Sequence, residues 1–330
     1  MAVTMKEVAE RAGVSVATVS RVLNGTTYVA PEAAERINNA IKELGYSPNF
    51  FGRSLRKSET RIILAIVPGA ESSFYNDVLT GMQDAASSRG YELIVGTSGN
   101  DTAKEQRLLS MLENRIVDAA VLLGSCMSPA EVTSYAEKYS IALACERIPG
   151  AEVLTVTVDD EVAALEAVRL IISKGHRKIG LVTAAGTAVS AVDRRIGYEK
   201  ALLEAEITYR EEYVYMGTYS FDSGVDAYKY FSKLIDPPSA IFCISDLLAA
   251  AILKSYASDT RNGHYFKVMG FDNIQLAELI TPGLTTVSQP SYDIGYTVIE
   301  KVISRQSDKT NDSHNKHIKL PFKIIERESL

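Results

Sequence analysis

Two hydrophobic periodicities divide the 330-residue chain. Up to residue 44, apolar side chains recur three and four positions apart within short segments, which is the spacing of amphipathic helices. From Arg61 onward, short apolar runs alternate with helix-period segments. Because alternating strands and helices build parallel sheets, this pattern predicts a small all-α head and an α/β body of two doubly wound parallel-sheet lobes.

The head begins with two closely spaced helices. Thr4 and Glu7 form a capping box at the start of the first helix, and Gly13 ends it because glycine tolerates a left-handed conformation. Ser15 is the expected N-cap of the second helix. The residues that pack this helix against the first are Val19, Val22 and Leu23. The sharp turn between two packed helices predicts a helix-turn-helix.

The second helix leaves Val16, Ala17, Ser20 and Arg21 facing outward. Outward residues near the start of a recognition helix read base edges in the major groove, and Arg is the side chain best shaped for guanine. A plain two-helix hairpin with a solvated polar face is the alternative. We favour DNA binding because a third helix, with Pro31 at its first position, completes a small three-helix unit.

A linker follows this unit. Tyr46-Ser47-Pro48-Asn49 breaks the helical pattern, and residues 50–57 form a basic stretch with one prominent leucine, Leu55. This stretch is too short to form a stable helix alone. We therefore divide the chain into a DNA-binding head at 1–48, a hinge at 49–60 and a body at 61–330.

The body contains two successive series of strand–helix units. In the first lobe we expect strands at 62–67, 92–96, 119–123, 142–145 and 153–158, and helices near 75–89, 101–115 and 129–139. In the second lobe we expect strands at 179–183, 212–216, 240–244, 264–270 and 285–289. A helix at 291–304 returns to the first lobe, a polar loop spans 305–316, and 318–327 form a final strand pair. The lobes then comprise 61–158 with 291–318, and 159–290 with 319–330.

The net charge of −6 is divided unevenly. Residues 1–60 carry eight Lys and Arg against six Glu, so they have a charge of +2 and the remainder has −8. This asymmetry directs the head toward phosphate and keeps the body away from it. The first helix begins at Thr4, and no run reaches about 18 uncharged apolar residues, so we expect no signal peptide, no membrane contact and a cytoplasmic protein.

Neither a metal site nor a catalytic centre is indicated. Cys126, Cys145 and Cys243 are widely spaced, and we expect buried thiols. His314 and His317 could suggest a metal pair, but their polar surroundings favour a solvated tail. No phosphate loop, nucleophile elbow or zinc motif occurs in the sequence. We therefore expect no metal, no cofactor and no enzymatic activity.

Residues that follow the strands are the candidates for ligand binding, because ligands bind at the carboxyl ends of parallel strands. Phe74 and Tyr75 could stack on a ring, Arg194 offers a planar fork, and Tyr219, Asp246 and Asp272 also come just after strands. Each has a simpler interpretation. Asp272 could cap the next helix, and either aromatic residue could be packing. We expect Arg195 to be a solvated charge. We expect Glu146 and Arg147 to form an ion pair at the rim of the cleft, and the alternative for these two residues is contact with a ligand.

The chain resembles the lactose/galactose repressor (LacI/GalR) family over its whole length. The phrases that carry the resemblance are Val-Ala-Glu-Arg-Ala-Gly-Val-Ser, Thr-Val-Ser-Arg-Val-Leu-Asn, Leu-Gly-Tyr-Ser-Pro-Asn and Arg-Ser-Leu. It implies a body like that of periplasmic binding proteins, with an effector cleft between the lobes lined by Phe74, Tyr75, Ser190, Arg194, Tyr219, Asp246, Asp272 and Gln289. It also implies a homodimer on a pseudo-palindromic operator.

The same resemblance implies roles in the head and hinge. Val16 and Ala17 match the variable pair that selects operator sequence, and Arg21 matches a base-contacting arginine. Leu55 matches a hinge-helix leucine that wedges into the minor groove. Gly52 is a departure, because the family usually has Ala there, and glycine costs a helix about 1 kcal/mol. The expected DNA contacts are Thr4, Ser15, Val16, Ala17, Thr18, Ser20, Arg21, Asn24, Tyr46, Asn49, Arg53, Leu55 and Lys57.

Within the family, residues 289–295 and 157–163 are most similar to the carbon catabolite control branch. That branch uses a serine-phosphorylated carrier protein as corepressor and has basic residues eight and twelve positions after the residue that matches Tyr292. Here those positions hold Glu300 and Ser304. Because a carboxylate repels phosphoserine, we favour a small-molecule effector, a sugar, sugar phosphate or nucleoside, with the carrier protein as the alternative.

Three classes of function are compatible with at least part of this sequence. A ligand-gated transcription regulator, acting with either an inducer or a corepressor, accounts for head, hinge and cleft together. A free sugar-binding protein accounts only for the body, and a doubly wound enzyme accounts only for the sheets. The regulator is the expectation, with repression as its mode.

Overall fold

The computed structural model describes residues 3–24, 28–46, 59–69, 73–186, 188–258, 265–307 and 316–330. The chain separates into two compact units, Met1–Thr60 and Arg61–Leu330. No helix within the described ranges is both long and apolar enough to cross a membrane.

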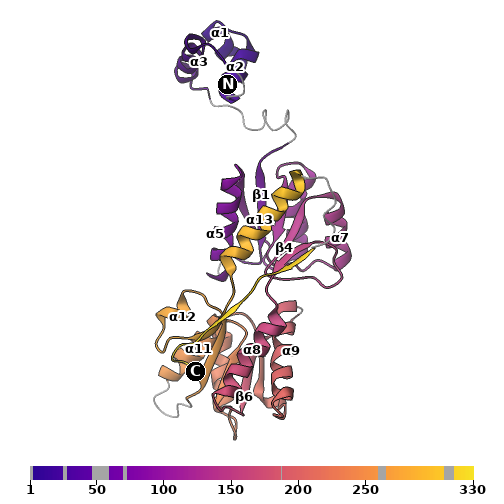
Figure 1. Ribbon diagram of the computed structural model, residues 1–330, viewed down its shortest axis with the longest axis vertical. Coiled ribbons are helices and arrows are strands. Elements are labelled where there is room, and N and C mark those ends of the chain that lie inside the picture. The colour runs from indigo at the N-terminus through magenta and orange to yellow at the C-terminus, as the bar shows by residue number, and fades with distance from the viewer. Residues whose placement is uncertain are drawn as a thin grey trace. The chain divides into compact units, whose positions relative to one another are not determined.

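The first unit is a three-helix bundle made of α1 (Met5–Ala12), α2 (Val16–Asn24) and α3 (Pro31–Leu44) (Figure 1). Thr4 and Glu7 form the predicted capping box, in which the Glu7 carboxylate accepts from the Thr4 backbone N–H at 2.6 Å. Gly13 has φ of 66°, as the turn between α1 and α2 requires. The core of the bundle consists of Val8, Ala9, Ala12, Val19, Ile37, Ala40 and Tyr46.

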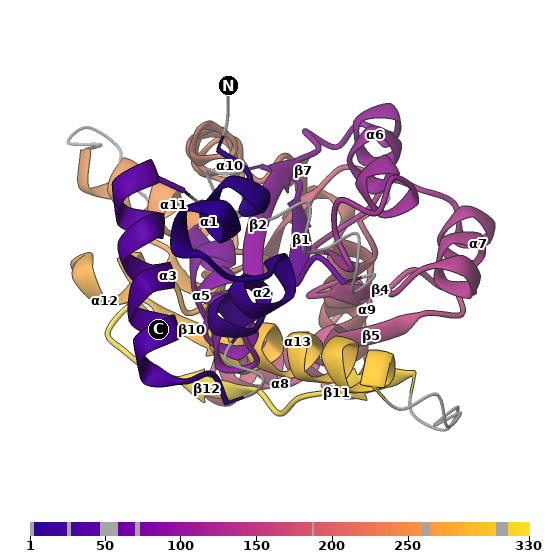
Figure 2. The same ribbon diagram turned by 90° about the horizontal axis from the view of Figure 1, so that it is seen from above.

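The first lobe of the body is a six-stranded sheet in the order β11-β5-β4-β3-β1-β2, with every neighbouring pair parallel. Its strands are β1 (Ile62–Val67), β2 (Glu92–Thr97), β3 (Ala119–Leu122), β4 (Ile141–Ala144), β5 (Leu154–Thr157) and β11 (His317–Lys319). Its helices are α5 (Ser73–Ser88), α6 (Thr102–Glu113), α7 (Pro129–Lys138) and α13 (Ser291–Ser307). Figure 2 shows α6 and α7 on one side of the strands and α13 on the other. A separate apolar core fills each side.

The second lobe is a sheet in the order β12-β10-β9-β8-β6-β7. Its strands are β6 (Ile179–Ala184), β7 (Val214–Gly217), β8 (Ala240–Cys243), β9 (Lys267–Asp272), β10 (Thr285–Ser288) and β12 (Lys323–Ile325). Its helices are α8 (Asp160–Ser173), α9 (Val189–Glu204), α10 (Phe221–Ser232), α11 (Asp246–Ser258) and α12 (Leu276–Leu279), with a 3₁₀ turn at Glu211–Tyr213. The two parallel-sheet lobes predicted from the sequence are confirmed.

Two strands form where a final strand pair was predicted at 318–327, but they do not pair with each other. β11 pairs with β5 of the first lobe, whereas β12, which starts four residues after β11 ends, pairs with β10 of the second. β12 is antiparallel to β10, so the second sheet is not purely parallel. The chain crosses from the first lobe to the second at Leu320-Pro321-Phe322.

Helices α5 and α13 approach so closely at two glycines that no side chain fits there. A Cβ atom at Gly81 would overlap the carbonyl oxygen of Tyr292, and one at Gly295 would overlap the carbonyl oxygen of Val78. The two glycines let the helix backbones come into contact. This contact fixes the C-terminal helix on the first lobe.

Candidate functional site

Five side chains from both lobes meet at the carboxyl ends of the strands. They are Tyr75 on α5, Glu146 after β4, Arg194 on α9, Tyr219 after β7 and Asp272 at the end of β9. Burial raises the pKa of Tyr75 well above its usual value, and the nearby groups Cys145, Glu146, Tyr219 and Asp272 raise it further. Arg194 joins this group because its Nη1 lies 3.7 Å from the Asp272 carboxylate. We call these five residues the cleft cluster.

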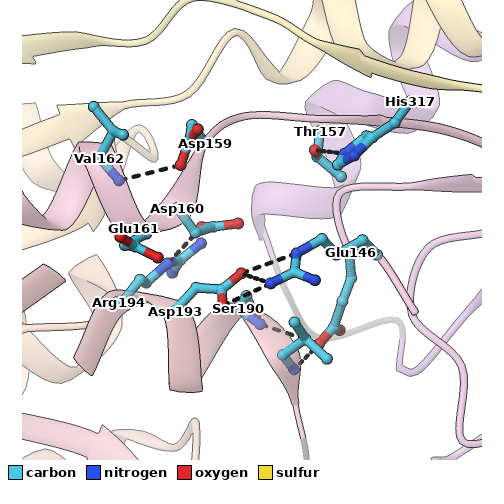
Figure 3. A network of polar contacts seen from close by, with 12 residues as sticks. Glu146, Thr157, Asp159, Asp160, Glu161, Val162, Ser190, Asp193, Arg194 and His317 are labelled. Atoms are coloured by element: carbon cyan, nitrogen blue, oxygen red, sulfur yellow. Dashed lines mark hydrogen bonds and ion pairs between the residues drawn. The ribbon is translucent and has the colours of Figure 1, made fainter. Parts of the chain in front are cut away.

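Arg194 is buried and already bound by protein groups on several sides. Its Nε donates to the Asp160 carboxylate at 2.8 Å (Figure 3). Its Nη1 donates to the Ile244 carbonyl at 2.5 Å. The guanidinium carbon lies 3.6 Å from the centre of the Phe271 ring. The Asp272 carboxylate is 3.7 Å from Nη1. Arg194 is therefore a charge centre of the cleft, shared by two carboxylates.

Asp272 is held by Arg194 and Gln289. The Gln289 amide Nε2 donates to the Asp272 carboxylate at 2.7 Å. Burial raises the pKa of Asp272 to about 6 although Arg194 opposes the shift. Its backbone has φ of 114°, a conformation that is strained for a residue with a Cβ atom. The alternative role as a helix cap is not observed, since the N-cap of α12 is Gln275.

The aromatic residues divide into packing and exposed members. Phe74 is buried in the core of the first lobe, so the packing interpretation applies to it, and its ring centre lies 5.5 Å from that of Tyr75. Tyr75 is half-buried, and Tyr219 is 44% exposed. Burial of the phenol raises the pKa of Tyr219 to about 12. Tyr75 and Tyr219 therefore remain the aromatic candidates for contacting a ligand.

Asp246 differs from the other predicted cleft residues because its side chain is fully buried. One carboxylate oxygen accepts from the Ile274 backbone N–H at 2.8 Å, and the other accepts from the Thr286 hydroxyl at 2.5 Å. Both oxygens are thus used to join α11 to β10 and the loop after β9. The structure gives Asp246 a role in holding the second lobe together.

Two contacts join the lobes at the rim of the cleft. The Glu146 carboxylate accepts from the backbone N–H groups of Val189 at 2.5 Å and Ser190 at 3.4 Å, at the start of α9. Arg147 binds Asp193 through Nε at 3.1 Å and Nη2 at 2.8 Å. The predicted ion pair between Glu146 and Arg147 is therefore wrong, because each residue binds the opposite lobe. The sequence shows only that Glu146 and Arg147 are adjacent and oppositely charged, and this does not indicate that each binds a residue more than 40 positions away.

A polar cavity of about 300 Å³ adjoins this rim. Figure 3 shows some of the residues that line it, among them Asp159, Asp160 and Ser190. Around it, the Lys319 ammonium lies 2.6 Å from the Asp159 carboxylate, and His317 Nε2 lies 2.9 Å from the Thr157 hydroxyl. His317 therefore belongs to β11 and not to the solvated tail that we predicted, while His314 lies outside the described residues. The described ranges contain no group of three or more His, Cys, Asp or Glu placed to hold a metal ion.

The exposed face of the head carries the predicted base-reading residues. Ser15, Val16, Ala17 and Arg21 are exposed, and Val16 is 42% exposed despite being apolar. The Ser15 hydroxyl accepts from the Thr18 backbone N–H at 3.2 Å and so caps α2. The side chains of Thr4, Ser15 and Thr18 form hydrogen bonds at the starts of α1 and α2, so they also stabilise the fold of the head.

The other predicted DNA contacts are either partly or fully buried or lie outside the described residues. Tyr46 is only 8% exposed and lies in the head core, where its ring packs instead of reaching outward. Ser20 is half-buried. Asn49, Arg53, Leu55 and Lys57 lie outside the described residues, as does the side chain of Asn24.

Sequence comparison matches both units to family models. Residues 4–49 match the lacI family of bacterial regulatory proteins, and residues 60–328 match the periplasmic binding proteins and sugar binding domain of the LacI family. The chain is 32% identical over 296 residues to the transcriptional repressor CytR of Escherichia coli strain K12, covering 89% of this chain and 87% of CytR. It is 31% identical to catabolite control protein A of Priestia megaterium, covering 100% of this chain and 99% of that protein.

Solved structures give the same picture. A complex of the transcriptional regulator CelR with cellobiose superposes with a TM-score of 0.72 at 30% identity, covering 99% of both chains. A lac repressor dimer bound to operator and an anti-inducer superposes with a TM-score of 0.86 at 20% identity, covering 100% of this chain and 99% of that one. At that identity the second comparison establishes the shared fold.

Proposed function

Since the chain belongs to the LacI family of bacterial regulatory proteins, we propose that it is a sequence-specific repressor whose operator affinity is set by a small molecule bound between its lobes. The observation that carries this proposal is the presence in one chain of both matched parts, at residues 4–49 and 60–328. A free sugar-binding protein has no use for the head. The relatives named above are regulators and not enzymes, and we assign no catalytic step.

We propose that the head recognises the base sequence of the operator. We propose that α2 enters the major groove, where Val16 and Ala17 contact base edges and Arg21 donates to guanine. Leu55 is proposed to wedge into the minor groove at the centre of the site. Because one head reads one half-site, the working unit is a homodimer on a pseudo-palindromic operator. A protein that acts on chromosomal DNA in this way works in the cytoplasm.

The cleft cluster, with Ser190 and Gln289, supplies the response to the effector. Aromatic faces at Tyr75 and Tyr219, with carboxylates and a guanidinium between them, suit a polyhydroxy ligand. The effector alters operator binding only as far as its own affinity differs between two arrangements of the body. CelR has been solved with cellobiose, and a carbohydrate is our proposal here as well.

The carrier-protein alternative is not favoured by the surface of α13. Glu300 faces Arg89 of α5, whose Nε and Nη2 donate to its carboxylate at 3.0 and 2.9 Å. The pair places a carboxylate where the catabolite control branch has a basic residue. Such a surface repels phosphoserine and leaves Arg89 already paired.

Selection from a random duplex library tests the proposal. The full chain is expected to enrich a palindromic site, and removal of residues 1–58 is expected to abolish that binding. Arg21→Ala is expected to weaken binding by about 1–3 kcal/mol per contact and to relax base preference at one position in each half-site. Absence of any enriched sequence contradicts the proposal.

A further inference from the structure

The charges of the cleft narrow the chemical class of the effector, an inference that rests on the proposed function. We infer that the effector carries a protonated amine on a polyhydroxy or ring-containing body, and that the carboxylates of Glu146 and Asp272 receive the positive charge. Phosphorylated and carboxylated compounds are excluded by the same charges.

Both arginines that border the cleft are already neutralised. Arg194 binds Asp160 at 2.8 Å and the Ile244 carbonyl at 2.5 Å. Arg147 binds Asp193 through two nitrogen atoms. An anionic ligand would have to displace a buried carboxylate from one of these pairs, and breaking such a pair leaves an uncompensated charge.

In the cleft, carboxylates outnumber the cationic side chains that could neutralise them. Asp272 shares Arg194 with Asp160, and lies farther from it, at 3.7 Å against 2.8 Å. Glu146 is bound by the backbone N–H groups of Val189 and Ser190. The cleft cluster and the adjoining Asp160 thus contain three carboxylates but one guanidinium, that of Arg194. Burial raises the pKa of both Glu146 and Asp272, as expected where negative charge lacks a partner.

Gln289 shows that the site also needs a hydrogen-bond donor. Its side chain is 5% exposed, and its Oε1 has no hydrogen-bond partner among the described residues. The amide cannot be reversed without losing the bond from Nε2 to Asp272, because a carboxylate accepts and does not donate. Oε1 is therefore fixed as an acceptor. A buried acceptor of this kind is satisfied by a donor from a ligand or an ordered water.

The aromatic members of the cleft cluster agree with a cation. Tyr75 and Tyr219 are both within electrostatic range of Glu146 and Asp272. The faces of tyrosine rings attract ammonium groups and repel anions. The basic residues of the neighbouring cavity offer no alternative for a phosphate, since Lys319 pairs with Asp159 and Arg147 pairs with Asp193.

Matched compounds test the charge directly. The full-length protein is titrated calorimetrically with a panel of hexoses, disaccharides and nucleosides, each as the neutral, the amino-deoxy and the phosphorylated compound. We expect an amino compound to bind at least about tenfold more tightly than its neutral counterpart, and no phosphorylated compound to bind. Tighter binding by a neutral or phosphorylated member, or no binding by any amino compound, overturns the inference.

Two variants then locate the charge. Glu146→Gln and Asp272→Asn are each expected to weaken binding of that amino compound about tenfold while changing affinity for its neutral counterpart less than threefold. Glu137→Gln, which removes an exposed carboxylate from α7, is the matched control and is expected to leave both affinities unchanged. Two variants are used so that a folding defect in one leaves the other as the test. If the amine preference persists in both, the assigned carboxylates are wrong.

Operator titration separates this inference from the proposed function. An amino compound that binds but leaves operator affinity unchanged contradicts effector control and leaves the charge inference intact. Operator affinity controlled by a phosphorylated compound supports effector control and contradicts the charge inference.

Discussion

Arg147 of the first lobe binds Asp193 of the second in a bidentate ion pair, with Nη2 2.8 Å from each carboxylate oxygen. Beside it, Glu146 holds the first backbone N–H groups of α9, for which the N-cap residue Ala188 supplies no side-chain bond. Two consecutive residues of one lobe thus anchor the same helix of the other. The lobes can separate on this side only if both contacts break.

Substitution of this pair tests whether it holds the lobes together. Arg147→Ala, Asp193→Ala and the double variant are expected to show a coupling of about 1 kcal/mol in urea unfolding, a modest value because Arg147 is 39% exposed. Small-angle scattering is expected to show a more open body in each variant. Arg169→Ala, which breaks ion pairs confined to the second lobe, should not open it. Additive effects in the cycle would mean that the pair is not coupled.

Asp272 gives the protein a specific dependence on pH. Its pKa is raised from 3.8 to about 6, so the folded state holds this proton more tightly than the unfolded state. The contribution of Asp272 to the free energy of unfolding therefore falls as the pH rises between about 4 and about 6, by up to about 3 kcal/mol, and is constant above that range. Asp272→Asn is expected to remove this fall. Urea unfolding across the range measures it, and an unchanged slope in the variant would assign the proton elsewhere.

Arg194→Ala is expected to do more than abolish the effector response. It leaves Asp160 and Asp272 buried without their cation, which is expected to destabilise the second lobe by about 3–5 kcal/mol. Arg194→Lys keeps the charge but loses the fork, so it should fold and still fail to respond. Arg195→Ala, in a half-exposed pair with Glu199, is the neighbouring control and should cost less than about 1 kcal/mol. Calorimetry and thermal unfolding measure both effects.

The contact between α5 and α13 predicts intolerance of a single methyl group. Gly81→Ala forces the two helix backbones apart and is expected to destabilise the body by about 3 kcal/mol, more than the roughly 1 kcal/mol that alanine gains in helix propensity. Gly69→Ala adds the same methyl group where no atom lies within 4 Å, and should be near neutral. Equal stabilities of the two variants would show that the helices adjust freely.

The hinge, which lies outside the described residues, provides a test of DNA bending. Leu55→Ala is expected to weaken operator binding and to reduce the bend, because an apolar wedge acts only where a base step is kinked. Gly52→Ala should favour a folded hinge by up to about 1 kcal/mol per subunit and so tighten binding. A circular-permutation gel shift measures the bend. An unchanged bend in Leu55→Ala would make that residue simple linker packing.

The positions of the helices and strands could be predicted from the sequence better than the pairing of the strands and the contacts of individual side chains. Periodicity identified the central strands because their apolar runs are buried on both faces, but it did not show that β11 pairs with β5 and β12 with β10 instead of with each other. Asp246 and Asp272 look equivalent in the sequence because each comes at the end of an apolar run. They differ because the Ile274 backbone N–H and the Thr286 hydroxyl bind both carboxylate oxygens of Asp246 and so keep it from contacting a ligand. Tyr46 was assigned to DNA by the resemblance to the LacI/GalR family, and its burial depends on the packing of the three helices, which no local pattern shows.

The return of α13 and β11 to the first lobe has a consequence for synthesis of the chain. Residues 291–319 are made after almost the whole second lobe, yet they cover α5 and complete the sheet beside β5. While the ribosome is still making the second lobe, the first has an uncovered apolar helix face and an open strand edge, features that favour aggregation. The first lobe therefore cannot be completed until almost the whole second lobe has been made, and any delay in translation between residues 159 and 291 prolongs its exposure.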